Sequence, residues 1–202
     1  MSILDKRLEL IFDRLKSPKF LDSVSLSNDM PYWIFDYEAK DELTIRGYIT
    51  KKLNPRFEKL EVAFHVINLY DVMLDMLEAR QLIDRIPDRE IKTGFDGLKK
   101  NLDSVLEQKK VAQFIADKYL DSLPKFIVIY GIGSCWPYIR AHAFLSVLQA
   151  ITGATPILLF YPGDYDGREI KPFNILKSEG YYRAFRLVPE KTAADLTTLM
   201  IN

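Results

Sequence analysis

Carboxylate and amide side chains recur in this chain where short apolar segments end. Asp36, Asn68 and Asp164 each close or follow such a segment, and Asp166 comes shortly after the last of them. In an open parallel sheet, ligands bind beyond the carboxyl ends of the strands, so we interpret these positions as a candidate ligand-binding edge. The alternative is that they belong to solvated loops, which are polar whatever the protein does.

A glycine turn follows the apolar segment 126–130. Its two glycines reach backbone conformations that are costly for other residues, and the serine after them suits the cap of a helix. The free amides at a helix N-terminus bind anions. We therefore interpret the segment as a strand, a tight turn and the start of a helix. Its candidate ligand-binding residues are Gly131, Gly133, Ser134, Trp136 and Arg140.

This turn departs from both standard phosphate-binding loops. The loop of nucleotide hydrolases needs a lysine to neutralise the phosphates, and no lysine stands between Gly131 and Arg140. A dinucleotide-binding turn needs a third glycine for close helix packing, and Trp136 occupies that position. We therefore expect a structural turn and no bound cofactor. A nucleotide- or anion-binding regulatory domain is the alternative.

Two charged strings, 87–92 and 164–171, look like fragments of a metal-dependent nuclease signature. That chemistry needs an aspartate at one strand end and a Glu-x-Lys on a neighbouring strand, so that both carboxylates hold Mg²⁺. The first string is too compact, and the second leaves a strand instead of lying on one. Solvated charged loops explain both strings better. A nuclease that uses Asp36, Asp164 and Asp166 is the weaker alternative.

The histidines and the cysteine argue against zinc and thiol chemistry. The chain has two histidines, His65 and His142, and one cysteine, Cys135. Residues so few and so far apart do not form a zinc site, and a single cysteine forms no internal disulfide. On one helix, the seven residues from Cys135 to His142 span roughly 10 Å, too far for a hydrogen bond. We predict no catalytic residue and no metal ligand.

The charge balance and the apolar segments limit the partners of the chain. Lys plus Arg and Asp plus Glu number 28 each among 202 residues, and this zero net charge argues against direct DNA binding. No apolar segment approaches the roughly 20 residues that cross a bilayer, and the N-terminus lacks the apolar core of a signal peptide. We expect a cytoplasmic protein without membrane contact.

Alternating strands and helices are expected to position the candidate residues. Strands are predicted at 32–37, 62–69, 126–130, 157–161 and 182–188. Helices are predicted at 2–16, 40–53, 70–86, 98–120, from the glycine turn to 151, and at 172–178 and 192–201, with loops at 21–31, 88–97 and 162–167. This alternation predicts a single α/β domain over residues 1–202, with three αβα layers and a mostly parallel sheet of roughly five strands. The fold is P-loop- or Rossmann-like, without the phosphate-loop lysine.

The order of several short strings resembles a known family. The strings are Trp33-Ile34-Phe35-Asp36-Tyr37, Asn68-Leu69-Tyr70-Asp71, the segment from Gly131 to His142, that from Leu159 to Gly167, and that from Tyr181 to Leu187. Together they are similar to the hallmark segments of BrxB, a small component of bacterial BREX phage-defence systems. The resemblance spans nearly the whole chain, and its specificity lies in the combined order of the strings.

The resemblance implies a non-catalytic scaffold or adaptor in a multi-protein assembly that methylates host DNA and blocks phage replication. It implies PglZ, the phosphatase-like BREX component, as a direct partner. The methyltransferase PglX and the ATPase BrxC would be further members of the assembly. The family provides no catalytic residues to transfer to this sequence. The strings therefore mark identity and assign no roles.

Overall fold

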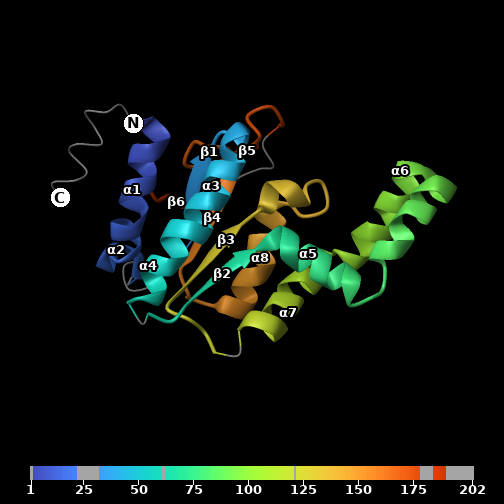
Figure 1. Cartoon of the computed structure of the whole chain (residues 1–202), viewed down its shortest axis with the longest axis horizontal. Coiled ribbons are helices and arrows are strands. Elements are labelled where there is room, and N and C mark those ends of the chain that lie inside the picture. Colours follow the sequence, from blue (N-terminus) through green and yellow to red (C-terminus); the bar gives the residue numbers. More distant parts are fainter. Residues whose placement is uncertain (1, 22–31, 61, 121, 178–183, 190–202) are drawn as a thin grey trace.

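A computed structural model describes residues 2–21, 32–60, 62–120, 122–177 and 184–189. Five parallel strands form its sheet in the order β2-β3-β4-β1-β6 (Figure 1). A further short strand, β5, pairs antiparallel with the end of β4. The strands are β1 Tyr32–Tyr37, β2 Phe64–Asn68, β3 Phe126–Tyr130, β4 Ile157–Tyr165, β5 Ile170–Pro172 and β6 Phe185–Arg186.

Aromatic side chains dominate one face of the sheet. Trp33, Phe35, Phe126, Val128 and Phe160 are buried there. They pack against the N-terminal helices and the helical tract between β1 and β2. These elements are α1 Ile3–Leu15, α2 Pro18–Leu21, the 3-10 turn η1 Ala39–Asp41, α3 Glu42–Tyr48, the π-helical turn η2 Ile49–Leu53 and α4 Asn54–Glu58.

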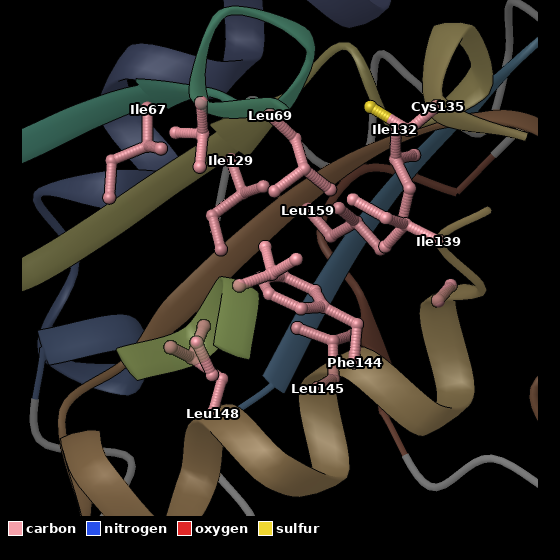
Figure 2. Close-up of a cluster of buried hydrophobic side chains, with 14 of the residues drawn as sticks. Ile67, Leu69, Ile129, Ile132, Cys135, Ile139, Phe144, Leu145, Leu148 and Leu159 are labelled. Carbon is pink, nitrogen blue, oxygen red and sulfur yellow. The ribbon is translucent and has the colours of Figure 1, made fainter. Parts of the chain in front are cut away.

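Aliphatic side chains dominate the other face. Ile34, Ile67, Ile129 and Leu159 are buried on this face and alternate with residues of the other face, because successive side chains of a strand point to opposite faces. Figure 2 shows Ile67, Ile129 and Leu159 in this aliphatic cluster. They pack against the second group of helices, so the predicted three-layer αβα arrangement is confirmed. These elements are α5 Leu69–Glu78, the 3-10 turn η3 Ile83–Arg85, α6 Ile86–Val105, α7 Gln108–Tyr119 and α8 Ala141–Thr152.

The predicted loop at 88–97 is wrong, because these residues belong to α6. Pro87 lies in the first turn of that helix, where its missing N–H costs little, so it begins a helix instead of ending the previous one. Gly94, at φ 68° and ψ 176°, divides α6 into two arms. Ile86 on the first arm and Leu98 on the second line one small cavity of about 120 Å³, so the arms lie against each other. We call this folded helix the α6 finger.

Other predicted boundaries also shift. The helix expected over 98–120 is interrupted at Leu106 and Glu107, where the backbone leaves the helical region. The loop expected at 162–167 is strand as far as Tyr165, because β5 pairs with it. The helix expected at 172–178 is replaced by turns over the part that is described. The predicted loop at 22–31 and the helix at 192–201 lie outside the described residues, as do 182 and 183 of the fifth predicted strand.

The α6 finger gives a first prediction about stability. Gly94 has a left-handed φ of +68°, yet no atom lies within 4 Å of where its Cβ would be. Gly94→Ala is therefore expected to lose about 1–2 kcal/mol of unfolding free energy through backbone strain alone. Gly47, in the helix α3, is equally open and lacks the positive φ, so Gly47→Ala is expected to gain about 0.5–1 kcal/mol. Urea denaturation of both variants measures the difference; equal midpoints would contradict the assignment of a turn at Gly94.

Candidate functional site

The predicted ligand-binding positions meet at the carboxyl ends of the parallel strands. Asp36 of β1 lies beside Tyr161 of β4 in the sheet register, and Asn68 of β2 lies beside Tyr130 of β3. The chain leaves β3 at Gly131, at the same edge. We call this region the carboxyl edge.

Asp36 is the centre of a buried ionic cluster. Its side chain is 3% exposed. The Arg7 guanidinium of α1 donates to Asp36 Oδ1 at 2.7 Å, and the Arg186 guanidinium of β6 lies 2.6 Å from Oδ2. The Tyr165 amide also donates to Oδ2, at 3.2 Å. Both carboxylate oxygens are therefore occupied by donors from other elements.

The same arginines hold the C-terminal segment against the sheet. Arg7 donates to the Val188 carbonyl from Nε at 3.1 Å and from a terminal nitrogen at 2.9 Å. Arg186 contacts the Asp164 carboxylate at 3.1 Å and donates to the Tyr165 carbonyl. The cluster thus connects α1, β1, β4 and the segment around β6, four elements distant in sequence.

This arrangement bears directly on the nuclease alternative. Asp36 and Asp164 both contact the Arg186 guanidinium, which lies between the two carboxylates. It occupies the place that a divalent cation would need. Asp166 is apart: its Oδ1 accepts from the amides of Arg168 and Glu169 at 2.8 Å each, and these bonds lower the pKa of that carboxyl. Within the part of the chain that is described, no three His, Cys, Asp or Glu side chains are grouped to hold a metal ion.

The glycine turn is fitted to β2. Gly131 has a left-handed φ of +77°, and a Cβ there would stand 2.2 Å from Asn68 Oδ1. That oxygen accepts from the backbone amide of Tyr70 at 3.2 Å. The side-chain nitrogen of Asn68, Nδ2, donates to the Asp71 carboxylate at 2.8 Å. Asn68 is thus the N-cap of α5, and its contact with Gly131 sets the distance between two strand ends.

The predicted start of a helix at Ser134 is wrong. Only a 3-10 turn, Ile132–Cys135, follows Gly131, and α8 begins at Ala141 with Arg140 as its N-cap. Trp136 is extended, at φ −67° and ψ 139°, because the residue before a proline is pushed out of the helical region. The α-helical N-terminus that favoured an anion at this turn is therefore absent.

Ser134 has a different role from the predicted cap. Its hydroxyl accepts from the Arg46 guanidinium at 2.6 Å. Arg46 also pairs with Glu42 at 2.8 Å, and Glu42 accepts from the Tyr37 hydroxyl at 2.5 Å. The hydrogen bond to Glu42 raises the pKa of Arg46, and burial raises the pKa of Tyr37. This chain of contacts ties α3 to the glycine turn.

Little space remains beside the turn. A Cβ on Gly133 would meet the Pro162 ring at 2.6 Å, so glycine is needed for the turn to lie against β4. The cavity that Gly133, Trp136 and Arg140 line with Pro162 is about 10 Å³, the room of a single water. A nucleotide does not fit there. Trp136 itself is 45% exposed and packs edge-on against Phe173, with ring centroids 6.3 Å apart.

Cys135 belongs to the core and not to a thiol site. Its side chain is fully buried at the rim of the aliphatic cluster, beside Ile132 and Ile139 (Figure 2). Its Sγ donates weakly to the Gly131 carbonyl at 3.5 Å, and burial raises the pKa of the thiol to about 12. The assumed shared helix with His142 does not exist, since Cys135 precedes α8.

The arginines that define the cluster were not among the predicted site residues. Arg7 lies three residues after Leu4 and four before Ile11, so it falls on the apolar stripe of its helix. A cation on a buried stripe needs a buried anion, and Asp36 within an aromatic strand is the matching carboxylate. That signal was available in the sequence. Arg186 offered none, because its strand is short and its neighbours are mixed.

Removal of the central carboxylate tests the cluster. Asp36→Asn keeps the shape of the side chain but removes the carboxylate that pairs with the buried Arg7 guanidinium and leaves Arg186 paired with Asp164 alone, so we expect a loss of about 3–5 kcal/mol of unfolding free energy. Asp103→Asn is the matched control, because its pair with Lys99 on α6 is largely exposed; it is expected to lose about 0.5 kcal/mol at most. Urea denaturation compares the two. Equal losses would mean that the cluster adds no more than a surface pair.

The reactivity of the single cysteine provides a second test. A raised pKa favours the neutral thiol, so at pH 8 only roughly one Cys135 in ten thousand is a thiolate, against roughly a quarter for an ordinary cysteine. We expect Ellman's reagent to modify the native chain at least about 100-fold more slowly than the urea-unfolded chain. Complete modification of the native chain within seconds would contradict the burial of this thiol.

The chain is similar to known proteins over most of its length. The family model described as "BREX protein BrxB" matches residues 65–187. The BREX protein BrxB of Escherichia coli O9:H4 (strain HS) is 40% identical over 188 residues, which cover 93% of each chain. The BREX protein BrxB of Bacillus cereus (strain H3081.97) is 30% identical over 192 residues, 93% of this chain and 99% of that one.

No solved structure matches the chain. Neither relative's name states an enzymatic activity. Among the residues that the structure covers, no helix is both long and apolar enough to span a bilayer. The family model covers more than half of the chain and both relatives cover nearly all of it, so the chain belongs to the BrxB family of BREX proteins.

Proposed function

We propose that this BREX component is a non-catalytic scaffold and that its direct partner is PglZ, with PglX and BrxC as further members of the assembly. The partners come from the family resemblance. Two regions of the molecule support this proposal. The carboxyl edge, where enzymes of this architecture carry their chemistry, bears on the non-catalytic role. The α6 finger, which projects away from the sheet (Figure 1), bears on the binding of a partner.

The polar residues of the carboxyl edge already have partners within the chain. Asp36 is held by two arginines, and Ser134 accepts from Arg46. Asn68 caps α5. Each contact stabilises the junction of two elements, and this supports a structural role for the edge.

The α6 finger is the observation that carries the proposal. Every residue from 87 to 96 is exposed. Two large apolar side chains lie on either side of the turn at Gly94: Ile91 is 84% exposed and Phe95 is 57% exposed. Charged residues of both signs surround them, namely Asp88, Arg89, Glu90, Lys92 and Asp96. An apolar centre with a charged rim is the usual composition of a protein interface.

The finger is therefore our proposed docking element for PglZ. Apolar and aromatic anchors supply most of the free energy of an interface, and truncation of such an anchor commonly costs 2 kcal/mol or more. Because Ile91 and Phe95 bury little surface in the free chain, their replacement leaves its core intact.

Co-purification with PglZ and titration of the full chain test this element. The double variant Ile91→Ala with Phe95→Ala is expected to weaken PglZ binding by about 30-fold or more and to leave the unfolding midpoint unchanged. Leu123→Ala is the matched control. Leu123 is 56% exposed, like Phe95, but it precedes β3 and so lies at the amino ends of the strands, outside the α6 finger. Its binding should equal that of the unchanged chain.

Two results would contradict the proposal at different levels. If the unchanged chain and PglZ elute separately at micromolar concentration, PglZ is not the direct partner. If they co-elute, but Trp136→Ala weakens binding and the finger variant does not, docking occurs at the carboxyl edge instead.

A further inference from the structure

A wide groove lies on the helical layer opposite the α6 finger. It runs between α1 and the tract formed by α3, η2 and α4, which lie beside each other (Figure 1), and it has a volume of about 790 Å³. None of the candidate residues of the carboxyl edge lines it. Its size suits a peptide segment and exceeds what a single ion needs.

One wall of the groove is strongly basic. Lys51, Lys52, Arg56 and Lys59 line it, all from the tract between β1 and β2. From Lys51 to Lys59 the tract rises by about 12 Å. In the described part of the chain, none of these four cations has a carboxylate within ion-pair distance. The opposite wall, on α1, carries the carboxylates Asp5 and Glu9.

Arg56 is held in place before any ligand arrives. Its guanidinium carbon lies 3.7 Å from the centroid of the Phe12 ring, so the side chain is stacked against α1. The π-helical turn at Ile49–Leu53 precedes it, and such turns are frequent at functional sites. A stacked guanidinium loses little freedom on binding, and its geometry suits a carboxylate or a phosphate as ligand.

The floor of the groove is largely apolar. Leu8, Tyr48 and Pro55 form it. Tyr48 is only 8% exposed, and its hydroxyl oxygen is buried, so the residue presents part of its ring to the groove. Apolar side chains of a ligand would cover this floor.

We propose that this groove binds an acidic peptide segment, with apolar side chains between its carboxylates, from another protein of the same BREX system. Its carboxylates contact the basic wall, and its apolar side chains cover the floor. The proposal rests on BREX membership and does not depend on PglZ docking at the α6 finger.

The groove favours a peptide over a nucleic acid. A phosphodiester chain carries negative charge along its whole length, so it would also face Asp5 and Glu9. A peptide can carry its carboxylates on the side that faces the basic wall and none on the side that faces Asp5 and Glu9. Leu8 and Pro55 on the floor likewise suit apolar side chains and offer nothing to a phosphate.

A tiled array tests the proposal. Peptides of about 15 residues that cover the other proteins of the same BREX system are probed with the labelled full chain, and the bound peptides are titrated by fluorescence anisotropy. A single-stranded DNA of similar length is titrated beside them. We expect the bound peptides to be acidic with interspersed apolar residues, and their affinity to fall with salt.

Two groove variants and one control locate the site. Lys51→Glu with Lys52→Glu reverses the basic wall and should weaken binding by about tenfold or more. Gly47→Phe should weaken it similarly, because Gly47 lines the groove and has open space at its Cβ position. Lys109→Glu with Lys110→Glu makes the same charge change on two adjacent exposed lysines of α7, and should change the affinity by less than about twofold.

Three results would overturn the proposal. The array binds no acidic peptide; the bound peptides are unaffected by both groove variants; or the DNA binds more tightly than every peptide and loses affinity in the groove variants. Gly47→Phe keeps the charge of the chain, so it separates a filled groove from a general electrostatic effect. Circular dichroism and urea midpoints of each variant confirm that it folds.

Discussion

The buried carboxylate of Asp36 is the constraint on which the rest of this structure depends. A charge within an aromatic strand is unstable unless cations reach it, and both of its oxygens are occupied by Arg7 and Arg186. Arg7 comes from the first helix, and Arg186 comes from the last described strand. Because each arginine also donates to a backbone carbonyl, the cluster fixes both ends of the described chain to the strands β1 and β4. A buried ion pair adds little net free energy over an apolar core, but loss of one partner is costly, so the cluster enforces one arrangement of these elements.

The carboxyl edge follows from this arrangement and from close packing around two glycines. Gly131 turns the chain against Asn68, and Gly133 allows the turn to lie on Pro162. The turn then sends Ile132, Cys135 and Ile139 into the aliphatic core (Figure 2). Beside the turn a cavity of only about 10 Å³ remains, and a more open hollow of about 310 Å³ lies at the ends of β1 and β4, where Tyr37, Asp164 and Lys171 line it. The turn joins elements instead of enclosing a ligand.

The α6 finger and the groove beside α1 lie away from that edge, on the helical layers. The finger carries the exposed Ile91 and Phe95, and the groove carries a row of cations over an apolar floor. They belong to helices on opposite faces of the sheet, so two partners could be held at once without contact between them. That division suits a component of a multi-protein assembly, in which each face of a small domain meets a different neighbour.

The sequence by itself determined the layers and the family. Short, continuously apolar strands that alternate with helices predicted a parallel sheet, because strands covered by helices on both faces are apolar along their whole length. The ordered strings predicted BrxB, and the comparisons confirmed it. Local signals failed at residues that suit two different structures. Pro87 can begin a helix as readily as it ends one, and here it begins α6. Ser134 can cap a helix, but here its hydroxyl accepts from Arg46. Only the tertiary structure decided which charges meet, since Arg7, Asp36 and Arg186 are distant in the chain and are brought together by the strand order. The tertiary structure also decided that the space beside the glycine turn is filled by side chains, whereas the groove beside α1 is open. The space beside a residue depends on neighbours that local sequence does not specify.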